Sequence, residues 1–160
     1  MAGPSLQERF APDGQCFGCG PRNAQGLRIR SFEADDGTVV AEWQPRPEHQ
    51  AFDGYVNGGI LATLVDCHSN WTGIAALLQR AHEAGWVGED APSTVTADLA
   101  IRYRRPTPSG QPIRLVGRAV EVEDRRVVVE TTVESGGEVT ATGRATFVAV
   151  GPGHPAYGRW

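Results

Sequence analysis

The chain has 160 residues, of which 40% are apolar and 21% charged, and its formal net charge is −4. These values fit one globular domain with a sizeable core, and a mildly acidic chain lacks the broad basic surface of a general nucleic-acid binder. We therefore expect no nucleic-acid partner. No stretch approaches the ~20 consecutive apolar residues of a membrane span, so we expect no membrane partner either.

In chain order, the sequence predicts two strands, one long helix and four further strands. Residues 1–22 are rich in Gly and Pro and predict a loop or loosely docked arm. Alternation of apolar and polar residues around an Asp-Asp-Gly turn predicts a hairpin over 27–32 and 39–43. A helical pattern then runs from Gly58 to about residue 85, and strand patterns follow near 94–104, 112–123, 125–135 and 138–149.

This order predicts an α+β domain over residues 23–150, with 1–22 as the arm and 151–160 as a C-terminal tail. One helix cannot cover both faces of a six-stranded antiparallel sheet, so the sheet should wrap around the helix and use a partner chain. Apolar positions on the helix repeat at alternating spacings of four and three residues. They predict a stripe that faces the sheet, made of Ile60, Leu64, Cys67, Trp71, Ile74 and Leu78.

Small residues line the opposite face of this helix and surround one carboxylate. Ala62, Asp66, Ser69, Gly73 and Ala76 lie roughly 200° around the helix, where another chain or a ligand can approach closely. An acid in an apolar helix is costly unless it is used, and a glycine pair at a helix start exposes N–H groups at the positive end of the dipole. Together they predict a site that polarises a carbonyl and attacks it.

Gly58 and Asp66 lie eight positions apart, which is ~12 Å along a helix, so one chain cannot direct both at a single carbonyl carbon. If two chains place their helices antiparallel, the Gly58 end of one can face Asp66 of the other. The two resulting sites would lie at the interface, and dimerisation would then be a condition for activity.

Residues 54–66, which read Gly-Tyr-Val-Asn-Gly-Gly-Ile-Leu-Ala-Thr-Leu-Val-Asp, resemble the signature of hotdog-fold acyl-CoA thioesterases of the phenylacetyl-CoA thioesterase (PaaI-like) branch. The resemblance extends to Cys-Phe-Gly-Cys-Gly at 16–20, to Gly-Leu at 26–27 and to residues 96–106. It implies a hotdog fold of order ββαββββ, in a homodimer or a dimer-of-dimers tetramer. The signature usually reads His-Gly-Gly, and Asn57 replaces that histidine; Asn can donate a hydrogen bond but cannot act as a general acid.

The same resemblance implies roles for individual residues. The Gly58 amide would hold the thioester oxygen while Asp66 of the facing chain acts as base or nucleophile. Asn57 is expected to contact substrate, to cap the helix or to do both, and the Thr96 hydroxyl to orient water or the carboxylate unless Thr96 is simply a β-branched strand residue. The expected substrate contacts are Gly59, His49, Ser69 and Asn70. A buried acid satisfied by backbone amides is the structural alternative for Asp66.

Three arginines lie at the C-terminal end of the predicted strand that carries Thr96. Arg102, Arg104 and Arg105 offer guanidinium groups suited to the phosphates of coenzyme A or of a carrier-protein arm, or they form a solvated edge with protective charges. His68 lies two positions beyond Asp66 and therefore points away from it.

The cysteine pattern predicts no metal site. Cys16-x-x-Cys19 could be half a zinc site, but no second pair with ligand spacing exists, and Cys67 belongs to the helix stripe. We therefore expect no metal and no cofactor beyond the coenzyme A that the substrate carries. Three cysteines, an odd number, after an N-terminus that does not resemble a signal peptide favour a cytoplasmic protein.

The sequence thus predicts a thioesterase that hydrolyses a small-molecule acyl-CoA to a free acid and coenzyme A. Two alternatives stay open. A non-catalytic acyl-CoA or acyl-carrier binding protein is favoured by Asn57 in place of the histidine. A hotdog dehydratase or hydratase would need His49 or His68 to pair with the acid.

Overall fold

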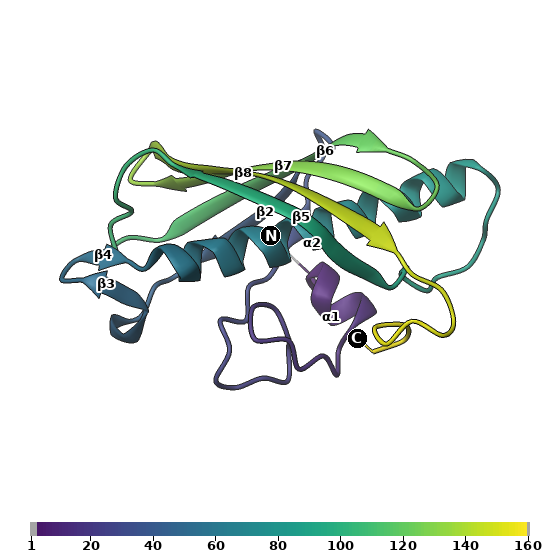
Figure 1. Ribbon diagram of the computed structural model, residues 1–160, viewed down its shortest axis with the longest axis horizontal. Helices are drawn as coiled ribbons and strands as arrows, with labels where there is room; N and C mark the ends of the chain where they lie inside the picture. Colours follow the sequence, from purple (N-terminus) through teal and green to yellow (C-terminus); the bar gives the residue numbers. More distant parts are fainter. Residues whose placement is uncertain (1–2, 160) are drawn as a thin grey trace.

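A six-stranded antiparallel sheet curls around one long helix, α2 (Gly58–Glu83), in the computed structural model, which describes residues 3–159 (Figure 1). The strands lie side by side in the order β1-β2-β6-β7-β8-β5. Their bounds are β1 Phe32–Glu33, β2 Val39–Trp43, β5 Thr94–Tyr103, β6 Ile113–Val122, β7 Arg126–Ser135 and β8 Glu138–Ala149. The α+β fold of two strands, one helix and four strands is confirmed.

Short elements occupy segments that we expected to be irregular. These are helix α1 (Leu6–Phe10), a 3-10 turn (Pro47–His49) and the small hairpin of β3 (Gln50–Phe52) with β4 (Tyr55–Val56). Conversely, residues 27–31 do not form a strand. The amides of Leu27 and Ile29 donate to the carbonyls of Phe17 and Gly18, and Arg28 has a φ of 55°, so this segment pairs with the N-terminal loop instead of with β2.

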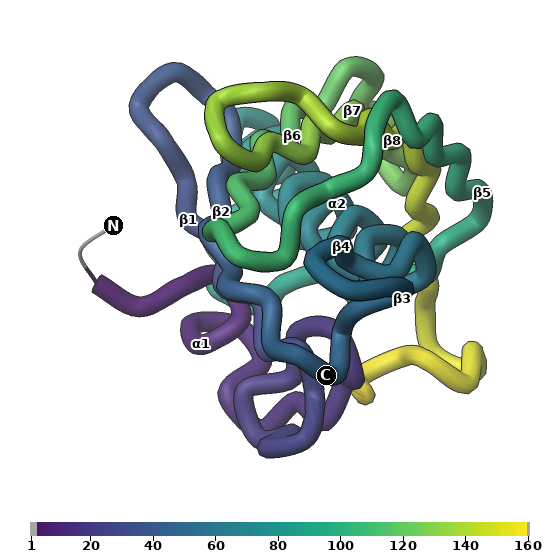
Figure 2. Tube along the Cα trace, turned by 90° about the vertical axis from the view of Figure 1, so that its left-hand side faces the viewer, coloured from purple at the N-terminus to yellow at the C-terminus, as the bar shows by residue number. Residues whose placement is uncertain are grey.

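The apolar stripe of α2 faces the N-terminal segment, which corrects the expectation that it faces the sheet. A Cβ atom on Gly18 would lie 2.3 Å from the Sγ atom of Cys67, and Leu78 lines one small cavity together with Leu6 and Phe10. The two views agree, since α2 lies between the sheet and the N-terminal segment in both (Figures 1 and 2).

The sheet approaches the small residues of α2 instead. Ser69 Oγ lies 2.8 Å from Thr131 Oγ1 on β7, and a Cβ atom on Gly73 would lie 2.7 Å from the Val127 side chain. Because the concave face of the sheet carries bulky side chains such as Val127 and Phe147, only small residues let the helix come this close. The small-residue face therefore packs within its own chain, apart from the position of Asp66.

The N-terminal segment is part of the core. Ser5 and Glu8 form a capping box at the start of α1, and Leu6 and Gln7 are buried. The side-chain amide of Gln7 donates to Ser31 Oγ at 3.0 Å and accepts from the Ser31 N–H at 2.9 Å. We expected a loop or loosely docked arm here; α1 instead closes the side of α2 that the sheet leaves open.

Within residues 3–159, no helix has both the length and the hydrophobicity needed to cross a bilayer.

Replacing Gln7 by Leu should destabilise the protein by about 1–3 kcal/mol, because the buried Ser31 N–H loses its acceptor. Gln15→Leu is the matched control, since Gln15 is exposed and its substitution should change the free energy of unfolding by no more than about 0.5 kcal/mol. Denaturant unfolding of both variants measures the difference. Equal stabilities would contradict the assignment of α1 to the core.

Candidate functional site

The N-terminus of α2 presents one uncommitted backbone donor. Asn57 caps the helix, because its Oδ1 atom accepts from the N–H groups of Gly59 at 2.7 Å and Ile60 at 3.3 Å. Among residues 3–159, the Gly58 N–H has no acceptor, while the Gly58 carbonyl accepts the hydroxyl of Tyr103 at 2.7 Å. Gly58 therefore offers a free N–H at the positive end of a 26-residue helix.

Sequence reasoning missed Tyr103, which ends β5 and ties this strand to the first turn of α2. Its place at the strand end was visible, but the contact with Gly58 depends on how the helix lies across the sheet. A Cβ atom on Gly58 would come 3.4 Å from the Tyr103 ring, so the backbone at this point lies close against the aromatic side chain.

Asp66 lies half-buried on α2 beside the other end of β5. Thr96 Oγ1 donates to Asp66 Oδ1 at 2.8 Å, and this is the only hydrogen bond to the carboxylate within residues 3–159. Burial raises the pKa of the Asp66 carboxyl above its usual value, the Thr96 hydrogen bond opposes the rise, and the charge of Cys16 adds to it. Among residues 3–159, no backbone amide donates to this carboxylate, so the structural alternative of an acid satisfied by backbone amides does not apply to Asp66.

β5 is an edge strand of the sheet and holds both halves of the site. Thr96 near its start contacts Asp66, and Tyr103 at its end contacts Gly58. Most side chains along β5 are exposed. A ten-residue, exposed edge strand invites pairing with another chain.

Three residues expected to contact substrate are buried and bonded within the chain. His49 is 5% exposed; its Nδ1 accepts from the Arg46 N–H at 3.0 Å, and its carbonyl accepts from the Asn57 N–H. Ser69 bonds to β7, and Asn70 Oδ1 accepts the Thr94 hydroxyl at 2.6 Å. Ser69 and Asn70 tie α2 to the sheet, the His49 side chain bonds within its own turn, and none of the three side chains is exposed. Gly59, by contrast, is exposed next to Gly58.

The three arginines do not gather at one point. Arg105 is paired with Glu138. Strand alternation places Arg102 and Arg104 on the outer face of the sheet, opposite Tyr103, where both line a groove of about 710 Å³. Within residues 3–159, neither Arg102 nor Arg104 has an acidic partner, so both remain available to an anion.

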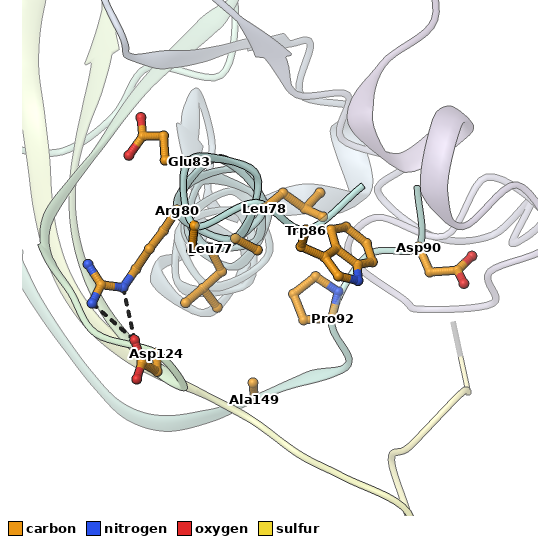
Figure 3. A pocket seen from close by; sticks show the side chains of 11 residues that line it. Leu77, Leu78, Arg80, Glu83, Trp86, Asp90, Pro92, Asp124 and Ala149 are labelled. Atoms are coloured by element: carbon orange, nitrogen blue, oxygen red, sulfur yellow. Dashed lines mark hydrogen bonds and ion pairs between the residues drawn. The ribbon is translucent and has the colours of Figure 1, made fainter. Parts of the chain in front are cut away.

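A second hollow lies at the C-terminal end of α2. This cavity of about 690 Å³ is lined by apolar side chains that include Leu77, Leu78 and Trp86, and at its rim Arg80 donates to Asp124 (Figure 3). Leu77 is eleven residues beyond Asp66, ~16 Å along the helix, so the cavity does not reach the carboxylate.

The structure also brings together the three cysteines, which the sequence analysis assigned to two separate segments. Cys16 and Cys19 lie against Cys67 on α2, with all three sulfur atoms within 4.8 Å of one another. Hydrogen bonds from the thiols of Cys19 and Cys67 and from the N–H groups of Cys19 and Gly18 hold the pKa of Cys16 well below its usual range. The contact with Cys16 raises the pKa of Cys19 and of Cys67, and burial adds to both shifts.

Comparisons with known proteins agree with this fold. A family model described as thioesterase superfamily matches residues 53–142. Acyl-coenzyme A thioesterase THEM4 of Rattus norvegicus is 27% identical over 119 residues, covering 73% of this chain and 45% of that protein. The chain therefore spans less than half the length of this curated relative.

Two solved structures have a similar fold over more than three quarters of this chain. A thioesterase superfamily protein from Shewanella loihica PV-4 superposes with a TM-score of 0.62 at 34% identity, covering 77% of this chain and 91% of that one. The PaaI protein from the phenylacetic acid degradation operon of E. coli superposes with a TM-score of 0.63 at 15% identity, over 78% and 81% of the two chains. The latter similarity shows the shared fold.

Proposed function

Since the chain belongs to the thioesterase superfamily, we propose that it hydrolyses an acyl-CoA to a free acid and coenzyme A, using Gly58 and Asp66 from two facing subunits. The observation that carries the proposal is the state of Asp66. Within residues 3–159 this half-buried carboxylate accepts one hydrogen bond, from Thr96, which leaves its second oxygen open. A structural acid at that depth would be satisfied by several donors.

In the proposed mechanism, the Gly58 N–H donates to the thioester carbonyl oxygen and stabilises the negative charge that develops there. Asp66 accepts a proton from water as the water oxygen attacks the carbonyl carbon. The tetrahedral intermediate then collapses, the carbon–sulfur bond breaks, and the proton on Asp66 passes to the departing thiolate. Direct attack by the Asp66 carboxylate, followed by hydrolysis of the anhydride, is the variant of this scheme in which Asp66 is the nucleophile.

The proposed dimer follows from β5. If two copies pair their β5 strands antiparallel about a two-fold axis, the Tyr103 end of one strand lies beside the Thr96 end of the other. Gly58 of one subunit then faces Asp66 of its partner, which neither chain can achieve alone. We propose such a homodimer, alone or as half of a tetramer, in the cytoplasm.

For the coenzyme A moiety, we propose that Arg102 and Arg104 contact the phosphates. Arg102 lies on β5, the strand that carries Thr96, and Arg104 comes directly after its last residue. Neither arginine has an acidic partner within residues 3–159, whereas Arg105 is held by Glu138. The acyl-CoA is the only ligand that this proposal requires, and no separate cofactor takes part in the proposed steps.

Thiol release from short, medium and aromatic acyl-CoAs tests the proposed activity. Turnover of at least one of them supports the thioesterase. The discriminating outcome is a rise in melting temperature with coenzyme A thioesters that are not consumed, which would identify a binding protein instead.

Replacing Thr96 by Val should lower kcat about tenfold, because the Asp66 carboxylate loses the hydroxyl that orients it. Thr96→Ser keeps a hydroxyl at this position and should restore most of the activity. KM should change little in either variant, since Thr96 acts through Asp66. Steady-state kinetics of the two variants test this positioning role. If Thr96 were only a β-branched strand residue, Val would serve as well as Thr and Thr96→Val would keep the parent kcat.

A further inference from the structure

The chain's three cysteines form one cluster, which the proposed hydrolysis does not use. The sulfur atoms of Cys16 and Cys67 are 3.7 Å apart, and all three sulfur atoms lie within 4.8 Å of one another. A tetrahedral zinc site with Zn–S bonds of ~2.3 Å separates its sulfur atoms by ~3.8 Å. The cluster therefore already has nearly the spacing of three thiolates around one metal ion.

The loop that carries Cys16 and Cys19 is shaped around these sulfur atoms. A Cβ atom on Gly18 would lie 2.3 Å from Cys67 Sγ, and one on Gly20 would lie 2.5 Å from the Cys16 nitrogen. Both positions exclude a side chain. The glycines thus let the loop fold tightly and bring its two cysteines onto the helix.

Hydrogen-bond donors surround the cluster. The backbone N–H groups of Gly18 and Cys19 point at Cys16 Sγ, and the indole N–H of Trp71 donates to Cys19 Sγ at 3.3 Å. Donors of this kind stabilise thiolates, the form of cysteine that binds metal, and they orient the sulfur atoms.

We propose that Cys16, Cys19 and Cys67 bind one zinc ion through three thiolates, with water in the fourth position. Cys19 and Cys67 are buried and Cys16 is half-buried, so solvent reaches the cluster from the Cys16 side. Binding forms three zinc–sulfur bonds and releases the thiol protons to solvent. The ion ties the N-terminal loop to α2, at the residue that follows Asp66.

Thiolate ligation of this kind selects zinc over the hard cations Mg²⁺ and Ca²⁺, which prefer oxygen donors. It also explains why a CxxC pair occurs without a second pair in the sequence. The third ligand comes from the helix, 48 residues after Cys19.

Metal content is the direct test. The full chain is purified under reducing conditions, loaded with a small excess of Zn²⁺, desalted and analysed by atomic emission. We expect one zinc ion per chain, and we expect Cys16→Ser to lose it. Because Cys16 is half-buried, this variant should keep its fold, which thermal unfolding of the metal-free proteins checks. His154→Ala is the control for adventitious binding to exposed imidazole and should retain the zinc.

Cobalt substitution tests the ligands themselves. The parent and His154→Ala should show a strong ultraviolet sulfur-to-cobalt charge-transfer band, and Cys16→Ser should lose most of it. Zinc should also raise the melting temperature of the parent but not of Cys16→Ser. The proposal is overturned if the parent retains no zinc, if Cys16→Ser retains as much as the parent, or if thiol titration finds two of the cysteines joined in a disulfide with no metal bound.

Discussion

The Asp66→Asn variant should hydrolyse acyl-CoA ~10²- to 10⁴-fold more slowly than the parent, because a neutral amide can neither take a proton from water nor attack the carbonyl. The substitution preserves size and keeps an oxygen for the Thr96 hydroxyl, so geometry alone cannot account for the loss. The measurement is kcat/KM from thiol release with the best acyl-CoA of the panel, and KM should stay near the parent value.

Asp35→Asn is the matched control for this experiment. Asp35 is exposed in the turn between β1 and β2, and its substitution makes the same chemical change without touching the site. It should leave kcat/KM unchanged. Full activity in Asp66→Asn, or an equal loss in both variants, would remove Asp66 from the mechanism.

Replacing Gly58 by Pro should lower kcat ~10²- to 10³-fold, because proline has no N–H to donate to the thioester oxygen. The fold should survive. Gly58 is the first residue of α2, the position at which helices tolerate proline, and Asn57 already has the φ of −62° and ψ of 135° that a following proline requires. The capping bonds from Gly59 and Ile60 to Asn57 are untouched.

Gly58→Ala is the control because it adds a side chain and keeps the N–H. Its Cβ atom would lie 3.4 Å from the Tyr103 ring, an ordinary contact, so activity should stay within a few-fold of the parent. Steady-state rates of the two variants, together with their melting temperatures, separate loss of the donor from loss of the helix start. Similar rates for Gly58→Pro and Gly58→Ala would show that this amide does not act on the substrate.

The strands after residue 94 could be predicted from the sequence within one residue at each end. Expected bounds of 94–104 and 112–123, for example, correspond to Thr94–Tyr103 and Ile113–Val122. Alternation of apolar and polar residues and the glycine- or proline-rich turns are local signals, so they do not depend on what the strands pack against. The start of α2 was equally clear, because Asn57 and the glycine pair mark a helix N-terminus.

The candidate site was only partly visible in the sequence. Its signals pointed to Asp66, Gly58 and Thr96, and the structure adds Tyr103. Thr96 contacts Asp66 and Tyr103 contacts Gly58, so β5 connects the two parts of the site. The polar character of Ser69 and Asn70 is the same whether they face a ligand or the chain's own sheet. Their burial depends on β7 and β5, which lie far away in the sequence.

By itself, the sequence determined the long helix, the four strands that follow it, their order and the polar residues that stand out on α2, because all of these follow from local periodicity. Only the tertiary structure decided which face of α2 meets the sheet and which meets the N-terminal segment. The sheet and the N-terminal segment both present apolar surfaces to α2, so the hydrophobic pattern of the helix cannot show which of them each face meets. Close packing decides this, because the bulky side chains on the concave face of the sheet leave room only for small residues such as Ser69 and Gly73. That choice leaves Cys67 facing the loop of Cys16 and Cys19 and so assembles the sulfur cluster.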